Sequence, residues 1–148
     1  MESAALLHDL DKALPSDDPR KVLGHGDAGA QWLVDHGYPE LARPVANHPV
    51  ARLGDDERYR RWASFASREE RIVAYADKRA AQRLQTMDAR FARWERRHPD
   101  YGDSLVRARR RAERLEHDIC AAAGISPAEV RRLPWVARAM ATARVGSR

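Results

Sequence analysis

Two adjacent side chains near the start of the chain are of types that bind divalent metals. His8 and Asp9 follow an apolar turn, residues 4–7, and Lys12 comes three positions after the aspartate. Imidazole nitrogens and carboxylate oxygens are common ligands of transition metals. Adjacent residues of a regular helix point about 100° apart, so the pair could hold one ion together, and the carboxylate could bridge to a second. The chain therefore opens on a candidate metal site.

Three residues further along have local reasons to face the same site. His25 stands between two glycines, where a backbone can approach closely. His48 ends a predicted helix, because Pro49 prevents its continuation. Asp77 lies among apolar residues of another predicted helix, a costly place for a carboxylate without a partner. With the opening pair, these side chains form a predicted set of five metal ligands.

Each of the five also has a structural explanation. Asp9 could pair with Lys12 across one helical turn. Asp77 could pair with Lys78, Arg79 or an arginine from another helix. The two downstream histidines, taken singly, would more often be ordinary helix-terminus residues. The joint appearance of all five favours the metal site.

The elements that carry these residues are predicted to be helices. The chain has 148 residues, with eight glycines and eight prolines, and no segment alternates apolar and polar residues over a strand length. Helices are predicted over residues 27–36 and 39–47. Ser67 and Glu70 form a capping-box pattern that opens the helix of Asp77. An all-α fold is therefore expected.

Residues 50–66 are expected to be less regular than the helices on either side. Their aromatic side chains could stack a nucleobase, but packing beneath a long loop is the favoured interpretation. These side chains are Tyr59, Trp62 and Phe65.

Basic side chains are concentrated in the second half of the chain. Residues 1–79 contain 12 basic and 14 acidic side chains, whereas residues 80–148 contain 15 and 8. A basic tail can bind nucleic acid, but a solvated arginine-rich helix surface is favoured. We expect a core domain over residues 1–98 and an arginine-rich helical extension over residues 99–148 that packs on it.

Cysteine usage and hydropathy predict the compartment. The single cysteine, Cys120, excludes an intrachain disulfide framework and fits a reducing environment. No apolar run is long enough to span a bilayer, and the first residues do not resemble a signal peptide. A cytoplasmic protein with no membrane partner is expected.

Four segments together resemble a known family. Residues 6–12 resemble the LLHD(I/L)xK signature of the HD-domain metal-dependent phosphohydrolases. Residues 24–30 are similar to that family's H-G-x-x-(G)-A helix start, and residues 45–48 to its next histidine. Residues 72–78 resemble its I-V-x-x-A-D-K helix. The similarity runs in order from residue 4 to about residue 92.

The resemblance implies a helical bundle around one or two divalent ions, such as Mn, Fe, Co, Ni or Mg. His8, Asp9 and Asp77 would hold the first ion. Asp9 would bridge to a second ion held by His25 and His48. A metal-activated water would then hydrolyse a small phosphate ester, with a nucleotide as the expected substrate.

The resemblance also assigns roles outside the ligand set. Asp9 and Lys12 would act in catalysis, and Lys12 would balance charge on the substrate phosphate. Charge and position alone add three weaker candidates for phosphate contacts. These are Lys78, Arg79 and Arg83.

The chain departs from the family pattern at one point. That pattern begins with a further histidine on a preceding helix, but only seven residues precede His8 and none is histidine. Either the reading frame starts late, or a ligand and the first helix have been lost. The second alternative would favour a module that binds metal or nucleotide in a regulatory role without turnover. A second subunit could then cover the core beside Leu6 and Leu7, so a homodimer is left open.

Overall fold

Helices make up the regular structure of the described part of the chain. The computed structural model describes residues 2–81, 83–134 and 138, and within them the expectation of an all-α fold is confirmed. Their β structure is an isolated bridge between Ala80 and Leu84. No helix among these residues has the length and apolar character to cross a membrane.

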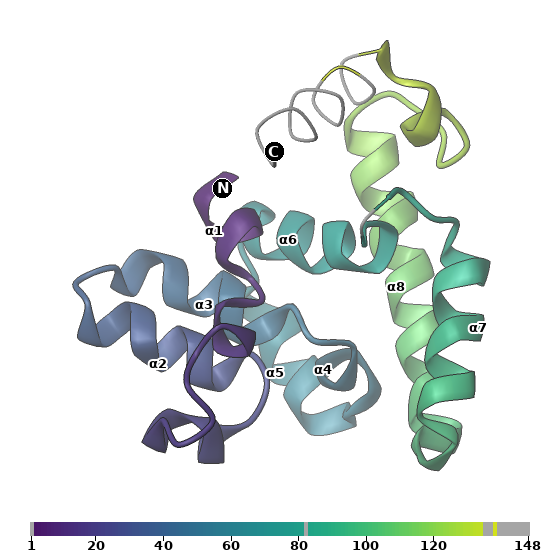
Figure 1. Ribbon diagram of the computed structural model, residues 1–148. Helices are drawn as coiled ribbons and strands as arrows, with labels where there is room; N and C mark the ends of the chain where they lie inside the picture. Colours follow the sequence, from purple (N-terminus) through teal and green to yellow (C-terminus); the bar gives the residue numbers. More distant parts are fainter. Residues whose placement is uncertain (1, 82, 135–137, 139–148) are drawn as a thin grey trace. The chain divides into compact units, whose positions relative to one another are not determined.

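The elements follow one another with short connections (Figure 1). They are α1 (Glu2–Leu7), η1 (Leu10–Lys12), η2 (Pro19–Leu23), α2 (Asp27–Asp35), α3 (Pro39–Asn47), α4 (Val50–Gly54), α5 (Asp56–Phe65), α6 (Arg68–Arg79), α7 (Met87–Arg97), η3 (Pro99–Tyr101), α8 (Gly102–Ala122) and η4 (Glu129–Arg132), where η denotes a 3-10 helix.

The chain divides into two compact units, residues 1–115 and 116–148. In the second unit α8 ends before Gly124, whose φ of 67° suits the left-handed turn that follows a helix. The division at residues 98 and 99 stays a prediction.

The core of the first unit forms where α2, α3 and α6 pack against one another. Leu33 of α2 and Val45 of α3 are fully buried between these helices. Gly29 lets α2 approach closely, because a Cβ there would lie 3.3 Å from both Val45 and the backbone of Asp11. The N-terminal helix α1 packs on α3 and α6, which brings the chain from residue 8 onward over the centre of the bundle.

The predicted capping box at the start of α6 is confirmed. The Ser67 side chain accepts a hydrogen bond from the Glu70 backbone, and the Glu70 carboxylate accepts one from the Ser67 backbone. These bonds satisfy N–H groups that a helix start leaves unpaired. The cap sets the register of α6, which buries Val73 and Ala74 in the core and carries Asp77 in its last turn.

The prediction that residues 50–66 are less regular is wrong. This stretch forms α4 and α5, which meet at Asp55. The Asp55 side chain accepts a hydrogen bond from the Arg58 backbone and caps α5. The acidic run at residues 55–57 marks a helix N-terminus, where negative charge is favourable.

Arginines of α8 hold the end of α4. Arg111 donates to the carbonyl of Leu53 at 2.7 Å and pairs with the carboxylate of Asp56. Arg107 donates to the carbonyl of Gly54 at 3.1 Å. These contacts use carbonyls that a helix C-terminus leaves unpaired. The first turns of the arginine-rich helix are therefore part of the packing of the first unit.

We predict that Gly54→Ala destabilises the protein by about 1–3 kcal/mol, the usual cost of overpacking. A Cβ at this position would lie 2.7 Å from the backbone oxygen of Ser104, which cannot rotate away. This cost exceeds the gain of up to about 1 kcal/mol that alanine brings in a helix. Urea unfolding measures the effect, with Ser64→Ala at an exposed position of α5 as the control. Equal midpoints for the two variants would contradict the packing of α4 on α8.

Candidate metal centre

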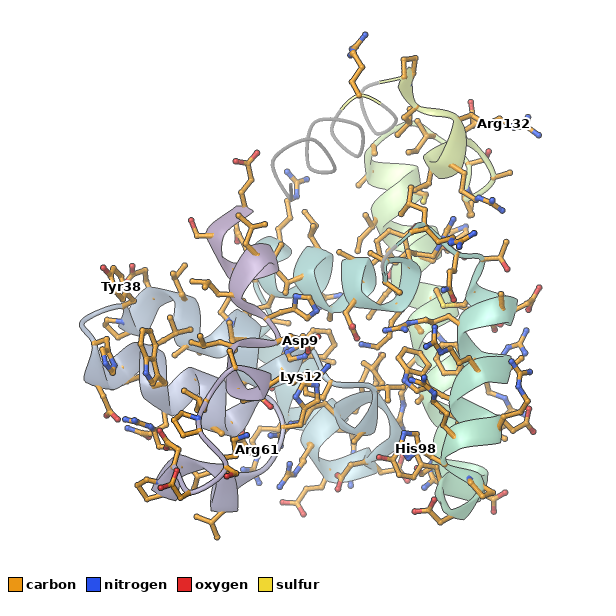
Figure 2. All side chains as sticks on the ribbon, viewed as in Figure 1. Asp9, Lys12, Tyr38, Arg61, His98 and Arg132 are labelled. Carbon is orange, nitrogen blue, oxygen red and sulfur yellow. The ribbon has the colours of Figure 1, made fainter. Side chains whose placement is uncertain are left out.

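The predicted ligand pair lies where α1 gives way to a turn. The helix ends at Leu7, and Asp9, with φ −98° and ψ 18°, precedes η1. His8 and Asp9 therefore lie between α1 and η1 and not within a regular helix. Asp9 lies beside Lys12, whose Nζ is 2.7 Å from the Asp9 carboxylate (Figure 2).

The three predicted ligand histidines, His8, His25 and His48, each donate a hydrogen bond through Nδ1. His8 Nδ1 donates to the Ala5 carbonyl at 2.7 Å, and His48 Nδ1 to the Val45 carbonyl at 2.6 Å. His25 Nδ1 donates to the Asp11 carboxylate at 2.9 Å. An oxygen acceptor at Nδ1 fixes the tautomer in which Nε2 carries the lone pair. All three rings therefore present Nε2 as a metal ligand.

Two of these nitrogens face each other across a short gap. His25 Nε2 and His48 Nε2 are 3.2 Å apart. Two lone pairs at this distance repel unless a proton or a cation lies between them. Ligand atoms about 2.1 Å from a shared ion, at tetrahedral or octahedral angles, are about 3.0–3.4 Å apart. Burial lowers the pKa of His48, which disfavours the extra proton and leaves the cation as the better partner.

Asp9 completes this group with a buried oxygen. Asp9 Oδ1 is 3.6 Å from the Nε2 atoms of both His25 and His48, and it has no hydrogen-bond partner among the described residues. An unpaired buried carboxylate oxygen is costly. A metal ion would satisfy it, so the residues present fit a divalent ion.

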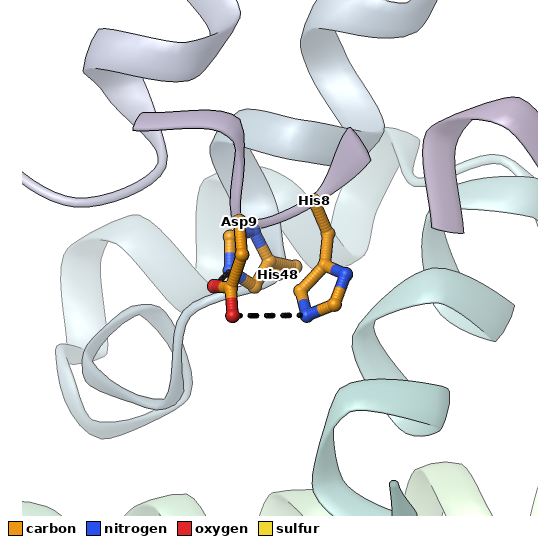
Figure 3. A group of neighbouring side chains, drawn as sticks. All are labelled: His8, Asp9 and His48. Carbon is orange, nitrogen blue, oxygen red and sulfur yellow. Dashed lines mark ion pairs between the residues drawn. The ribbon is translucent and has the colours of Figure 1, made fainter. Parts of the chain in front are cut away.

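The other oxygen of Asp9 faces a second group. Asp9 Oδ2 is 3.6 Å from His8 Nε2, and the same nitrogen is 3.8 Å from Asp77 Oδ1. His8, Asp9 and His48 each place one ligand atom within 4.8 Å of the others (Figure 3). Asp9 thus lies between two sets of ligands, as its predicted bridging role requires.

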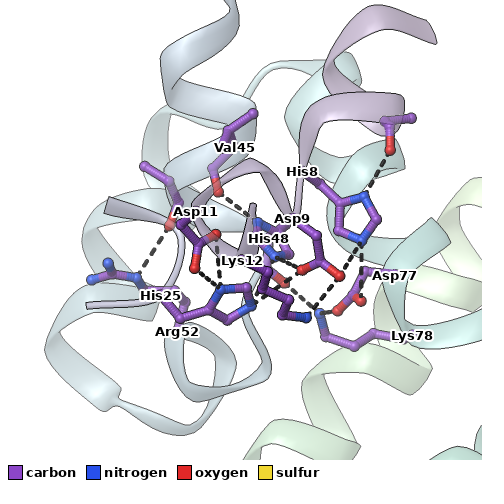
Figure 4. A network of polar contacts seen from close by, with 12 residues as sticks. His8, Asp9, Asp11, Lys12, His25, Val45, His48, Arg52, Asp77 and Lys78 are labelled. Carbon is purple, nitrogen blue, oxygen red and sulfur yellow. Dashed lines mark hydrogen bonds and ion pairs between the residues drawn. The ribbon is translucent and has the colours of Figure 1, made fainter. Parts of the chain in front are cut away.

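The electrostatics keep both carboxylates charged. Burial alone would raise the pKa of Asp9, but the Lys12 ammonium, 2.7 Å from Oδ2, outweighs it and holds the pKa below its usual value. Burial would likewise raise the pKa of Asp77, and Lys78, His48 and Arg90 hold it down. Figure 4 shows the network that surrounds them. Both groups are therefore anionic ligands at neutral pH.

Three of the residues predicted to contact phosphate, Lys78, Arg79 and Arg83, lie outside the pocket beside the ligands. Lys78 is fully buried, and its Nζ donates to Asp77 Oδ2 at 2.7 Å and to the His48 carbonyl. Arg79 is buried and donates to the Gln85 carbonyl and the Tyr75 hydroxyl. Arg83 is exposed. None of the three lines the pocket beside the ligands, so only Lys12 of the four predicted phosphate contacts faces that pocket.

A pocket of about 560 Å³ opens beside these ligands. His25 and Asp77 line it together with Lys12. Four arginines and three aromatic rings, which sequence analysis did not predict here, complete the polar and aromatic lining. These are Arg52, Arg58, Arg90, Arg97, Trp94, His98 and Tyr101.

The chain matches the model of one known protein family. The family model described as "HD domain" matches residues 1–82, more than half of the chain. The chain belongs to the HD-domain family. A search of curated proteins and a search of solved structures each returned no match. HD domains are in general hydrolases that bind divalent metals, in keeping with the ligand cluster.

The HD-domain match includes all five predicted ligands and also Asp11, whose role sequence analysis missed. Asp11 is 9% exposed, and its carboxylate accepts a hydrogen bond from His25 Nδ1 at 2.9 Å. The signal in the sequence that could have identified Asp11 is its position two residues after Asp9. Arg90 lies beyond the matched segment and reaches Asp77 from α7.

We predict that Asp11→Asn weakens Mn²⁺ binding about tenfold. The amide still accepts a hydrogen bond, but it lacks the charge that fixes the His25 ring, and loss of such outer partners costs about 10–100-fold in affinity. Calorimetric titration measures the affinity, and circular dichroism checks the fold. Asp17→Asn, at an exposed position of the following loop, is the matched control. Equal affinities in the two variants would show that Asp11 does not position a ligand.

Proposed function

We propose that this HD-domain protein is a metal-dependent phosphohydrolase that acts on a nucleotide or a related small phosphate ester. The observation that carries the proposal is the junction of the ligand cluster with a cationic pocket. His25 and Asp77 belong to both. A phosphate in that pocket would lie beside the side chains that fit a divalent ion.

The ion would supply Lewis acidity and would lower the pKa of a nearby water. The chain's own cations support binding of the anion. Lys12 lines the pocket, while its Nζ also lies against Asp9. Arg90 extends from α7, with its guanidinium 4.4 Å from the centre of the Trp94 ring and 3.3 Å from Asp77 Oδ1. Guanidinium groups suit phosphate because they present several donors in one plane.

The aromatic rings favour a substrate with a planar base. Trp94 and Tyr101 line the same pocket as the cations. Stacking on such rings is worth about 1–3 kcal/mol for a base and tolerates different bases. A phosphate group held by cations and a base held on a ring are the two parts of a nucleotide.

A second candidate is a module that binds metal or nucleotide without turnover. The pairing of Asp77 favours it, because Oδ2 accepts from Lys78 and Oδ1 from Arg90. A metal ion must compete with these cations for the carboxylate, which weakens the site built by His8 and Asp77.

An assay of phosphate release tests the proposal. Purified protein is incubated with nucleoside mono-, di- and triphosphates in the presence of Mn²⁺, Co²⁺, Ni²⁺ or Mg²⁺. We expect release with at least one ion. We also expect a loss of more than about 100-fold in Asp9→Ala, because a ligand matters more than the outer groups whose loss costs about 10–100-fold.

Asp17→Ala is the matched control, because it removes an exposed acid. Bound metal without phosphate release from any of these substrates would support the second candidate. Undiminished release by Asp9→Ala would contradict the assignment of the site.

A further inference from the structure

A second pocket, of about 420 Å³, lies on side chains of α3, α4 and α5. Four arginines line it, which are Arg43, Arg52, Arg58 and Arg61. Trp62 and Phe65 add aromatic surface. The volume is within the range of small-molecule sites, about 300–1,000 Å³. Sequence analysis assigned nothing to these arginines.

The pocket is positively charged. No carboxylate is among its lining residues, and the acids that pair with its arginines stand outside it. Glu57 pairs with Arg61, and both side chains are 75% exposed. Such surface pairs contribute about 0–1 kcal/mol, so an anion with two or more charges can displace them. Glu70 lies 3.3 Å from Arg43, whose side chain is 65% exposed, and does not line the pocket.

Two aromatic side chains, Trp62 and Phe65, line the pocket. Phe65 is 76% exposed, which leaves a ring face open to a planar partner. Trp62 is 7% exposed, and its indole N–H is buried with no hydrogen-bond partner among the described residues. A buried donor without an acceptor costs about 1–3 kcal/mol. Trp62 lines the pocket beside Phe65.

We infer that this pocket is a second binding site, for a ligand that carries both a phosphate group and a planar aromatic ring. The arginines match the phosphate charge, and the open ring of Phe65 matches the planar group. The site borders the metal-side pocket, because Arg52 and Arg58 line both. The inference does not rest on hydrolysis, since binding here needs no metal.

Nuclear magnetic resonance titration of the metal-free full-length chain tests it, with ADP and inorganic pyrophosphate as probes. We expect both probes to shift backbone amides of α5. In Arg61→Gln the affinity reported by those amides should fall about tenfold, the usual effect of losing a charged hydrogen bond. Arg60→Gln is the matched control, since Arg60 is exposed on the same helix and does not line the pocket.

The contribution of the Phe65 ring to binding is tested with the same two probes. ADP should bind the α5 site more tightly than pyrophosphate, and Phe65→Ala should remove this preference while Phe65→Trp keeps it. Equal losses in Arg61→Gln and Arg60→Gln would overturn the site, as would shifts confined to residues of the metal-side pocket. Equal affinities of the two probes in the unaltered protein would overturn the aromatic part of the ligand.

Discussion

The site depends on the carboxylate of Asp9, whose side chain is 39% exposed but whose Oδ1 is buried. Asp9 directs Oδ1 toward His25 and His48 and Oδ2 toward His8, and the Lys12 ammonium, 2.7 Å away, favours its anionic form. His8 and Asp9 lie in the turn between α1 and η1, where His8 Nε2 is 3.6 Å from Asp9 Oδ2. The rest of the first unit holds the histidines around that carboxylate.

The supporting groups explain how the rings keep their orientation. Each histidine donates Nδ1–H to a fixed oxygen, two of them backbone carbonyls one turn earlier and the third the Asp11 carboxylate. Lys78 ties α6 to the chain at His48 by donating to that carbonyl and to Asp77. Lys78, which was predicted to contact a phosphate or to pair with Asp77, therefore links two ligand-bearing segments from inside the protein. Its burial is compensated by these bonds.

The sequence predicted the parts of the fold that are set locally. The capping box marks the start of α6, the proline marks the start of α3, and the glycine marks the end of α2. Each acts within a few residues of its own position. Residues 50–66 were mispredicted although Asp55 offered a local N-cap for α5, whereas the contacts of Arg107 and Arg111 that hold the end of α4 come from more than 40 residues away. The pocket arginines were missed for the same reason. Arg90 meets Asp77 only through the packing of α7 on α6, and no spacing in the sequence encodes that contact.

The central claim is that Asp9 is shared between two sets of metal ligands. Anomalous diffraction from crystals grown with Mn²⁺ tests it most directly. The account predicts an anomalous peak within coordination distance, about 2.0–2.2 Å, of His25 Nε2, His48 Nε2 and one oxygen of Asp9. Where a second ion binds, its peak should lie against His8, Asp77 and the other oxygen of Asp9. Bound Mn²⁺ whose peaks lie away from Asp9 would contradict the account.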